Sequence, residues 1–250
     1  MLSPVERSSL SDQVYQQLRD GILAERYRAG ERLPSERELS ETLQVNRSSV
    51  REAIKRLEQA RLVEVRHGEG SIVLDFRLTA GFELLGELIM PGGSPNAVAL
   101  RSVLELRALI GPEVARLAAL RIQDDELERV EQLVARLEAC APEDTRCVQE
   151  LDFEFHYTLV QAGENLALLL LYNSIREVYL GSHALFSGMF GGARSRELYR
   201  PLLAALRARD AKRATRAALK LMEAGNTDFL RSVGAPSEEQ ATRAPLKRRR

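Results

Sequence analysis

Apolar residues recur at three- and four-residue steps along most of the chain, and this spacing predicts amphipathic helices. Near the N-terminus, Val14, Leu18 and Ile22 lie four apart and form one apolar stripe. Residues 77–233 follow the helical spacing almost throughout and are rich in Ala, Leu, Arg and Glu. Residues 62–74 break it, because two short β-prone runs flank a glycine-containing turn. The pattern therefore predicts a mainly α protein with one small β-hairpin.

Two capped helices precede the predicted hairpin. Ser35 with Glu38 three residues later fits a capping box and predicts the start of one helix. Asn46, which follows a tight turn, is a good N-cap for the next. That helix has apolar residues on one face and polar residues on the other, namely Arg47, Ser48, Ser49, Arg51 and Lys55. Two short helices joined by a tight turn and followed by a hairpin indicate a winged helix-turn-helix.

The polar face of the second helix suits duplex DNA. Arg47 and Arg51 lie four apart on one face, and each guanidinium offers a planar fork for guanine or for phosphate. Short hydroxyl side chains and the exposed helix N-terminus allow close approach to phosphate. A small wing turn fits a minor groove. The candidate DNA-binding residues are Arg37, Asn46, Arg47, Ser48, Ser49, Arg51, His67 and Gly68.

Overall charge does not support DNA binding, but local charge does. The chain has 36 basic and 36 acidic residues, a formal net charge of zero, so it is not a protein that coats nucleic acid non-specifically. Between Asn46 and Arg66, however, six residues are basic and three are acidic. We therefore expect the positive charge to gather on one surface of the N-terminal part.

These patterns divide the chain into four parts. We expect a winged helix-turn-helix DNA-binding domain over residues 1–76 and a linker helix over residues 77–92. Residues 93–233 are expected to form an all-α antiparallel helical bundle. Residues 234–250 are rich in Pro, Ser and charge without periodicity, and predict a disordered basic tail ending in the basic run 247–250.

Length, hydrophobic content and cysteine use narrow the cellular compartment in which we expect the protein. With 250 residues, 44% of them hydrophobic, the chain can bury two small cores. It has no run of 18 apolar residues and no apolar segment typical of a signal peptide at its start. Cys140 and Cys147 do not form a C-x-x-C pair, so we expect two free thiols in a reducing compartment. These features predict a cytoplasmic protein with no membrane partner.

The motifs resemble a known family. Residues 33–39, 45–54 and 66–70 resemble the GntR family of bacterial repressors. The C-terminal half is similar to the helical ligand-binding (FCD) domain of its FadR subfamily, through residues 101–107, 112–119 and 151–156. The resemblance implies a nucleoid-associated homodimer that binds a short palindromic operator in double-stranded DNA. It also implies that Arg37, Arg47, Arg51 and the wing His and Gly contact DNA, and that a small metabolite alters DNA affinity.

A pair of polar residues suggests a metal site. Asp152 and His156 lie four apart on a predicted helix, so both side chains face the same way and could hold Zn, Ni or Mn. The resemblance implies two further histidine ligands, but their positions fall on Tyr199 and Leu221. Since a zinc site usually has three or four protein ligands, the set is incomplete. A buried ion pair or hydrogen bond between Asp152 and His156 is the alternative.

The effector site has a second candidate feature. Arg107 lies in an otherwise apolar helix, where a buried cation needs an anion. An effector carboxylate or phosphate could supply it, and so could Glu113 or Asp152. The candidate effector-binding residues are Arg107, Asp152, His156 and Tyr199. An acyl-CoA cavity could instead be lined by Phe153, Phe155, Tyr157, Phe186, Met189 and Phe190, although such residues more often form plain core.

We therefore predict a ligand-responsive transcriptional repressor, with an organic acid or a fatty acyl-CoA as effector. A metal-dependent enzyme and a ligand-independent DNA-binding protein are the alternatives. An enzyme is disfavoured because residues 77–233 have no strand pattern, no Gly-rich phosphate loop and no nucleophile elbow.

Overall fold

The computed structural model describes residues 9–90, 95–141, 143–190 and 196–232. The chain divides into two compact units, Met1–Asn96 and Ala97–Arg250, called here the winged unit and the helical unit. The predicted tail, residues 234–250, lies outside the described residues.

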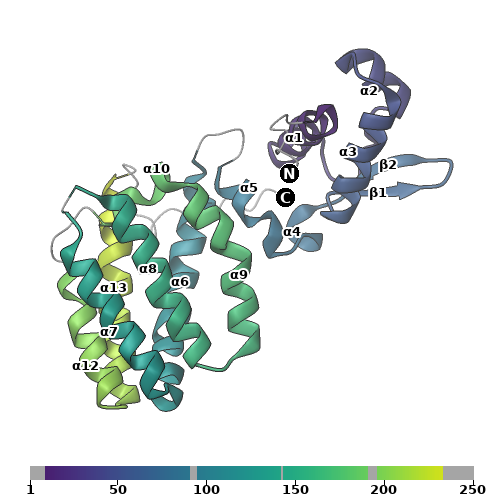
Figure 1. Cartoon of the computed structure of the whole chain (residues 1–250). Helices are drawn as coiled ribbons and strands as arrows, with labels where there is room; N and C mark the ends of the chain where they lie inside the picture. The colour runs from purple at the N-terminus through teal and green to yellow at the C-terminus, as the bar shows by residue number, and fades with distance from the viewer. Residues whose placement is uncertain (1–8, 91–94, 142, 191–195, 233–250) are drawn as a thin grey trace, which may run out of the picture. The chain divides into compact units, whose positions relative to one another are not determined.

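The winged unit has the predicted order of helices and strands (Figure 1). Ser35 caps the second helix with Glu38 as its partner, and Asn46 caps the third, as the sequence predicted. Between them the chain turns at Gln44, whose φ of 54° is left-handed. The elements are α1 (Leu10–Leu23), α2 (Glu36–Leu43), α3 (Arg47–Gln59), β1 (Val63–Arg66), β2 (Gly70–Val73), α4 (Phe76–Thr79), η1 (Phe82–Leu84) and α5 (Leu85–Ile89).

The core of the winged unit is the predicted apolar stripe of α1 packed against α3. The stripe residues of α1 are each at most 3% exposed, and they join the apolar face of α3 and the buried ends of the hairpin. β1 and β2 pair antiparallel, with Val63 opposite Val73 and Arg66 opposite Gly70. This packing fixes α3 with its polar face turned away from the core.

The segment predicted as a linker packs within the winged unit at least as far as α5. Leu84 is buried in the same apolar cluster as the stripe of α1. Glu87 of α5 forms an ion pair of 2.9 Å with Arg19 and accepts a weaker hydrogen bond of 3.4 Å from the hydroxyl of Tyr15. An apolar anchor and a charged contact therefore hold α5 to α1.

The helical unit is an antiparallel bundle in which α6 and α13 form the longest pair. α6 packs against α13 and α8, α7 packs against α8 and α12, and α9 packs against α8 (Figure 1). The elements are α6 (Ala97–Arg121), α7 (Asp124–Ala139), α8 (Thr145–Ala162), α9 (Leu166–Gly181), α10 (His183–Phe186), η3 (Ser187–Phe190), α12 (Tyr199–Arg207) and α13 (Ala211–Ser232).

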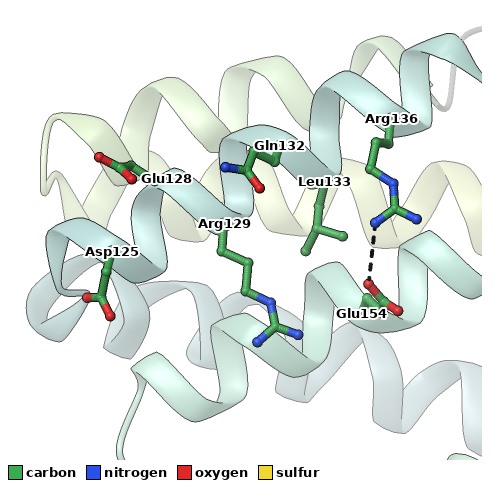
Figure 2. Close-up of a pocket in the computed structure, with 7 residues that line it drawn as sticks. All are labelled: Asp125, Glu128, Arg129, Gln132, Leu133, Arg136 and Glu154. Carbon is green, nitrogen blue, oxygen red and sulfur yellow. Dashed lines mark ion pairs between the residues drawn. The ribbon is translucent and has the colours of Figure 1, made fainter.

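The surface of the bundle is hollowed along α7 and α8 (Figure 2). The hollow has a volume of about 440 Å³ and charged walls. Arg136 of α7 and Glu154 of α8 face each other across it, 3.9 Å apart. None of the predicted effector residues lines this hollow, so it is separate from the predicted site.

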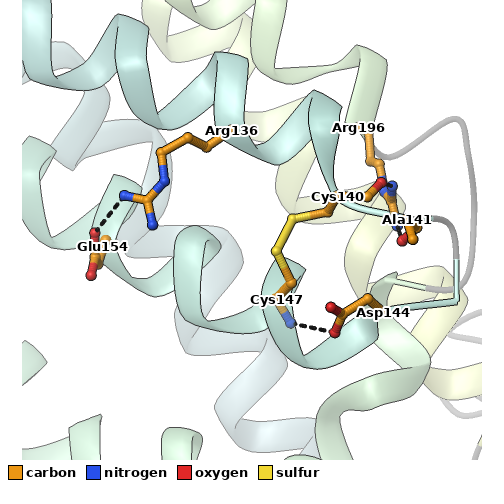
Figure 3. The surroundings of a disulfide bond; sticks show 7 residues. All are labelled: Arg136, Cys140, Ala141, Asp144, Cys147, Glu154 and Arg196. Atoms are coloured by element: carbon orange, nitrogen blue, oxygen red, sulfur yellow. Dashed lines mark hydrogen bonds and ion pairs between the residues drawn. A yellow bond between two sulfur atoms is a disulfide. The ribbon is translucent and has the colours of Figure 1, made fainter.

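The prediction of two free thiols was wrong. Cys140 and Cys147 form a disulfide that joins the end of α7 to the first turn of α8 (Figure 3). Arg196 donates to the carbonyl oxygens of Cys140 and Ala141 at 2.7 and 3.2 Å, and Asp144 accepts from the amide of Cys147 at 2.9 Å. A seven-residue separation is no recognised cysteine motif, and the pair comes together because a tight turn reverses the chain between the two helices.

Within the described part of the chain, no helix is both long enough and apolar enough to cross a bilayer.

Candidate nucleic-acid interface and buried polar cluster

The N-terminus of α3 is an exposed polar surface. The side-chain oxygen of Asn46 accepts from the amide of Ser49 at 2.8 Å and from the hydroxyl of Ser48 at 2.6 Å. Asn46 and Ser48 are exposed, and Ser49 is half-buried. The Ser48 hydroxyl therefore supports the helix cap in the unbound protein, and it would have to rotate to meet a phosphate.

The arginines beside this surface differ in their partners. Arg51 makes a two-pronged contact with Glu36 of α2, with Nε to Oε1 at 3.0 Å and Nη2 to Oε2 at 2.7 Å. These hydrogen bonds hold the pKa of Glu36 below its usual value. Arg37 makes a single longer contact of 3.4 Å with Glu41. Arg47 is exposed and makes no ion pair with any described residue.

The wing turn is narrow and exposed. Gly68 and Gly70 have φ values of 80° and 89°, which glycine adopts without strain. A Cβ atom on Gly70 would lie 2.8 Å from Nε of Arg32, so the wing strand leaves room for that side chain. His67 is exposed beside Gly68. The α3 face and the wing thus offer separate sets of donors on the winged unit.

A carboxylate lies buried in the helical unit, held by two tyrosines. Asp152 of α8 accepts from the hydroxyl of Tyr199 at 2.5 Å through Oδ1, and from the hydroxyl of Tyr179 at 2.7 Å through Oδ2. His156 lies one turn further along α8, with Nε2 3.2 Å from Oδ1. That contact is close, but it lacks the alignment of a hydrogen bond, and Nε2 has no hydrogen-bond partner. Asp152, His156, Tyr179 and Tyr199 are called here the Asp152 cluster.

Competing effects set the pKa of Asp152 in this cluster. Burial raises the pKa of Asp152, but the imidazole of His156, the guanidinium of Arg107 and the Tyr199 hydroxyl outweigh it and hold this pKa well below its ordinary value. Burial and the nearby carboxylate raise the pKa of Tyr179 and Tyr199 well above 10. At neutral pH the cluster is therefore a carboxylate with two phenol donors.

Arg107 of α6 is held by an amide and not by an acid. Its Nη1 donates to Oδ1 of Asn226 on α13 at 3.1 Å, and Nδ2 of Asn226 donates to the carbonyl of Leu104 at 3.0 Å. Glu113, one of the two acids considered as partners, pairs with Arg116 at 2.6 Å instead. Among the described residues Arg107 makes no ion pair, although its charge acts on Asp152.

Comparisons with known proteins agree with this architecture. The family model described as "Bacterial regulatory proteins, gntR family" matches residues 10–73, and the FCD domain model matches residues 102–224. The chain is 37% identical over 243 residues to the HTH-type transcriptional regulator Mce2R of Mycobacterium tuberculosis, covering 96% of this chain and 99% of that one. The chain belongs to the GntR family. It is therefore a transcriptional regulator with a helix-turn-helix DNA-binding domain and an FCD domain, and not an enzyme.

A second relative agrees in sequence, and one solved structure agrees in fold. The GntR-family chain is 34% identical to the HTH-type regulator Rv0494 of M. tuberculosis over 77% of its own length and 78% of that protein. Its fold is similar to that of Lar, described as controlling the Listeria monocytogenes agr system, with a TM-score of 0.56 and 17% identity over 91% of this chain and 99% of that one.

The buried cluster of this GntR-family regulator does not fit a metal ion. Two tyrosines already occupy both carboxylate oxygens of Asp152, and Leu221 at the remaining implied position is a buried apolar residue. The other histidine of the helical unit, His183, contacts Gln149 through Nδ1 at 2.5 Å. In the described part of the chain, no three His, Cys, Asp or Glu side chains gather as metal ligands would. Asp152 and His156 alone are too few for a zinc site.

Of the residues suggested for an acyl cavity, Phe153, Phe155 and Phe186 contact rings of the Asp152 cluster. The ring of Phe155 meets the rings of His156 and Tyr199 edge-on, and Phe186 contacts Tyr179 and Phe229. Phe153, Phe186 and Met189 are buried and Tyr157 is half-buried. The side chain of Phe190 lies outside the described part of the structure. These contacts form the apolar wall around a polar centre.

Sequence reasoning missed three partners: Glu36, Tyr179 and Asn226. Each lies on a different helix from the residue that it holds, at separations of 15, 27 and 119 residues. No local pattern in one sequence links positions so far apart. The best available signal was a polar residue interrupting an apolar helical stripe, which is how Arg107 was found.

Proposed function

We propose that the protein is a ligand-responsive repressor that binds a short palindromic operator as a homodimer. In this proposal α3 enters the major groove and the wing turn reaches the adjacent minor groove. A dimer offers two copies of α3, which suit two half-sites about one helical turn apart. The proposed DNA-contacting residues are Arg37, Asn46, Arg47, Ser48, Ser49, Arg51, His67 and Gly68.

The proposed effector is a small organic acid or a fatty acyl-CoA, and its anionic group is received by Arg107. The observation that carries this proposal is the pairing of Arg107, half-buried inside the bundle, with the neutral amide of Asn226. A half-buried cation that makes no ion pair is incompletely stabilised, so the site favours an anionic ligand. Arg107 also keeps donors in its fork for a carboxylate or phosphate.

The remaining proposed effector residues are Asp152, His156 and Tyr199. Their proposed role rests on Nε2 of His156, which is buried and close to Asp152 at 3.2 Å but makes no aligned hydrogen bond. A buried polar atom of this kind gains from a ligand that offers it a partner. The tyrosine donors on Asp152 reduce the repulsion that its carboxylate would exert on an incoming anion.

Ligand binding is proposed to order the bundle and thereby to change the spacing of the two recognition helices in the dimer. Operator affinity would then depend on the effector. A DNA-binding protein without a ligand is the competing function, and the two differ in whether any anion changes the affinity.

The test combines DNA binding with thermal melting of the full-length protein. A selection from a randomised duplex library should enrich a palindrome, and a panel of short hydroxycarboxylates and acyl-CoA thioesters should contain a member that raises the melting temperature and changes operator affinity. Arg107→Ala should abolish both ligand effects and keep operator binding. Arg116→Ala, on the same helix, is the control and should retain them. An unchanged response in Arg107→Ala, or no response to any anion in the wild type, would contradict the proposal.

A further inference from the structure

The contact between Arg51 and Glu36 has a specific geometry. Glu36 meets the guanidinium from its side, through Nε and Nη2. A guanidinium has five N–H donors, and a side-on carboxylate takes one on Nε and one on Nη2. The end of the fork, formed by Nη1 and the second N–H of Nη2, stays available.

The two helices fix both ends of this contact. Glu36 is the first residue of α2, directly after the capping residue Ser35, and Arg51 lies in the second turn of α3. The side chain of Glu36 is 35% exposed and that of Arg51 is 71% exposed. The carboxylate is therefore the more enclosed partner, and the guanidinium lies on its solvent side.

We propose that Glu36 is a positioning residue that aims the end of the Arg51 fork at a guanine, so that Arg51 reads a base from α3. This rests on the proposed function, in which α3 lies in the major groove. A guanine presents O6 and N7 side by side, and two parallel N–H groups of an arginine match them. Holding the planar group in place before binding reduces the freedom that it loses on the DNA.

The neighbouring arginines lack such a support. Arg47, one turn earlier on α3, makes no ion pair with any described residue, although its charge acts on Glu36 at longer range. Arg37 has one contact of 3.4 Å with Glu41, and both side chains are 64% exposed. Neither side chain is therefore held in one orientation before DNA binds in the way that Arg51 is.

Glu36 could act in the opposite sense, by occupying Arg51 and repelling phosphate. The two roles predict opposite changes in DNA affinity when the Glu36 carboxylate is removed. A blocking carboxylate weakens binding to every duplex, so its removal strengthens binding uniformly. A positioning carboxylate supports one base contact, so its removal weakens operator binding and relaxes the preference at one base pair in each half-site.

The experiment measures binding of the full-length protein to its selected operator and to every single-base variant of it. For Glu36→Gln we expect operator affinity to fall about tenfold and discrimination at one G·C pair per half-site to fall about tenfold, with other positions unchanged. In an Arg51→Ala background, Glu36→Gln should change discrimination no further. Glu41→Gln, which removes the partner of Arg37, is the matched control and should keep the base profile.

Uniformly tighter binding by Glu36→Gln would overturn the proposal. So would a relaxed base preference that persists when Arg51 is absent, or an Arg51→Ala variant with the wild-type base profile. If the wild type enriches no sequence from the library, the proposed operator binding itself fails, which is distinguishable from a failure at Glu36.

Discussion

Charged side chains pair on the surface of both units, but a network of buried polar side chains is described only in the interior of the helical unit. Of the polar and charged residues that are buried in the described structure, Ser11 lies in the winged unit, and the others lie in the helical unit: Gln149, Asp152, His156, Thr158 and Asn226. Arg51 and Arg107 represent the two arrangements. One is exposed and held by a carboxylate, and the other is half-buried and held by an amide.

The difference matches what each unit must recognise. An exposed arginine keeps its hydration and can share its donors between a glutamate and a base edge. An arginine inside a bundle has little water, so an acidic partner would neutralise the charge that a ligand needs. A neutral amide holds the Arg107 side chain in place without an ion pair, and the carboxylate of Asp152 acts on its charge only at longer range. The chemical type of the partner therefore separates the DNA-binding surface from the interior that is proposed to receive an anion.

The largest effect is expected from Asp152→Asn, which removes the charge at the centre of the interior network. Breaking a buried, hydrogen-bonded charge typically costs about 3 kcal/mol, so the unfolding free energy should fall by that amount at pH 7. Because the pKa of Asp152 is lowered in the folded protein, ionisation stabilises the fold above the pKa of an unfolded aspartate, about 3.9. That stabilisation is lost as the pH falls further.

Urea titrations at several pH values can check this. The gap between wild type and Asp152→Asn should be widest near neutrality and should narrow below about pH 4. Asp124→Asn, a change at an exposed ion pair with Arg209, is the control and should leave the unfolding free energy almost unchanged. A gap that is constant with pH would mean that the Asp152 charge does not stabilise the fold.

The second prediction concerns a variant that gives Arg107 a carboxylate partner, the type of partner that Arg51 has. Asn226→Asp places a carboxylate beside Arg107, and we expect effector affinity to fall about a hundredfold because the protein then supplies the anion. Asn226→Ala leaves Arg107 charged but less fixed, so its affinity should fall only about tenfold. Calorimetric titration with the anion found in the melting screen measures both. Equal losses in the two variants would indicate simple damage to the packing.

The smallest loss of stability is expected on removal of the disulfide. It lies in the helical unit, and the chain has no cysteines other than Cys140 and Cys147. Closing so short a loop is worth about 2 kcal/mol in the chain-entropy account. Cys147→Ser, or reduction of the wild type, should lower the unfolding free energy of the helical unit by that amount. The unfolding transition of the winged unit should not change. A reductant that also shifted the melting of Cys147→Ser would be acting elsewhere.

Local sequence signals were sufficient for the winged unit. The capping box at Ser35 and Glu38, the cap at Asn46 and the glycine turn of the wing are each encoded within a few residues, and all formed as predicted. Periodicity was sufficient to predict a helical bundle, because a repeated apolar stripe needs no partner to be recognised.

Side-chain partners could not be predicted in the same way. The hydroxyls on Asp152 come from α9 and α12, and the amide on Arg107 comes from α13. These contacts depend on how helices are packed, which is a property of the whole bundle. The disulfide was missed for a related reason, since its two cysteines meet only after the turn between α7 and α8 has formed.

The anchoring of α5 has a practical consequence for building hybrid regulators. Leu84 and Glu87 are bound into the DNA-binding half, so a junction placed directly after the wing would strip that half of part of its own core. A hybrid protein that keeps the chain through Met90 and replaces the residues after Asn96 would join the winged unit, with its core intact, to a different ligand-binding domain.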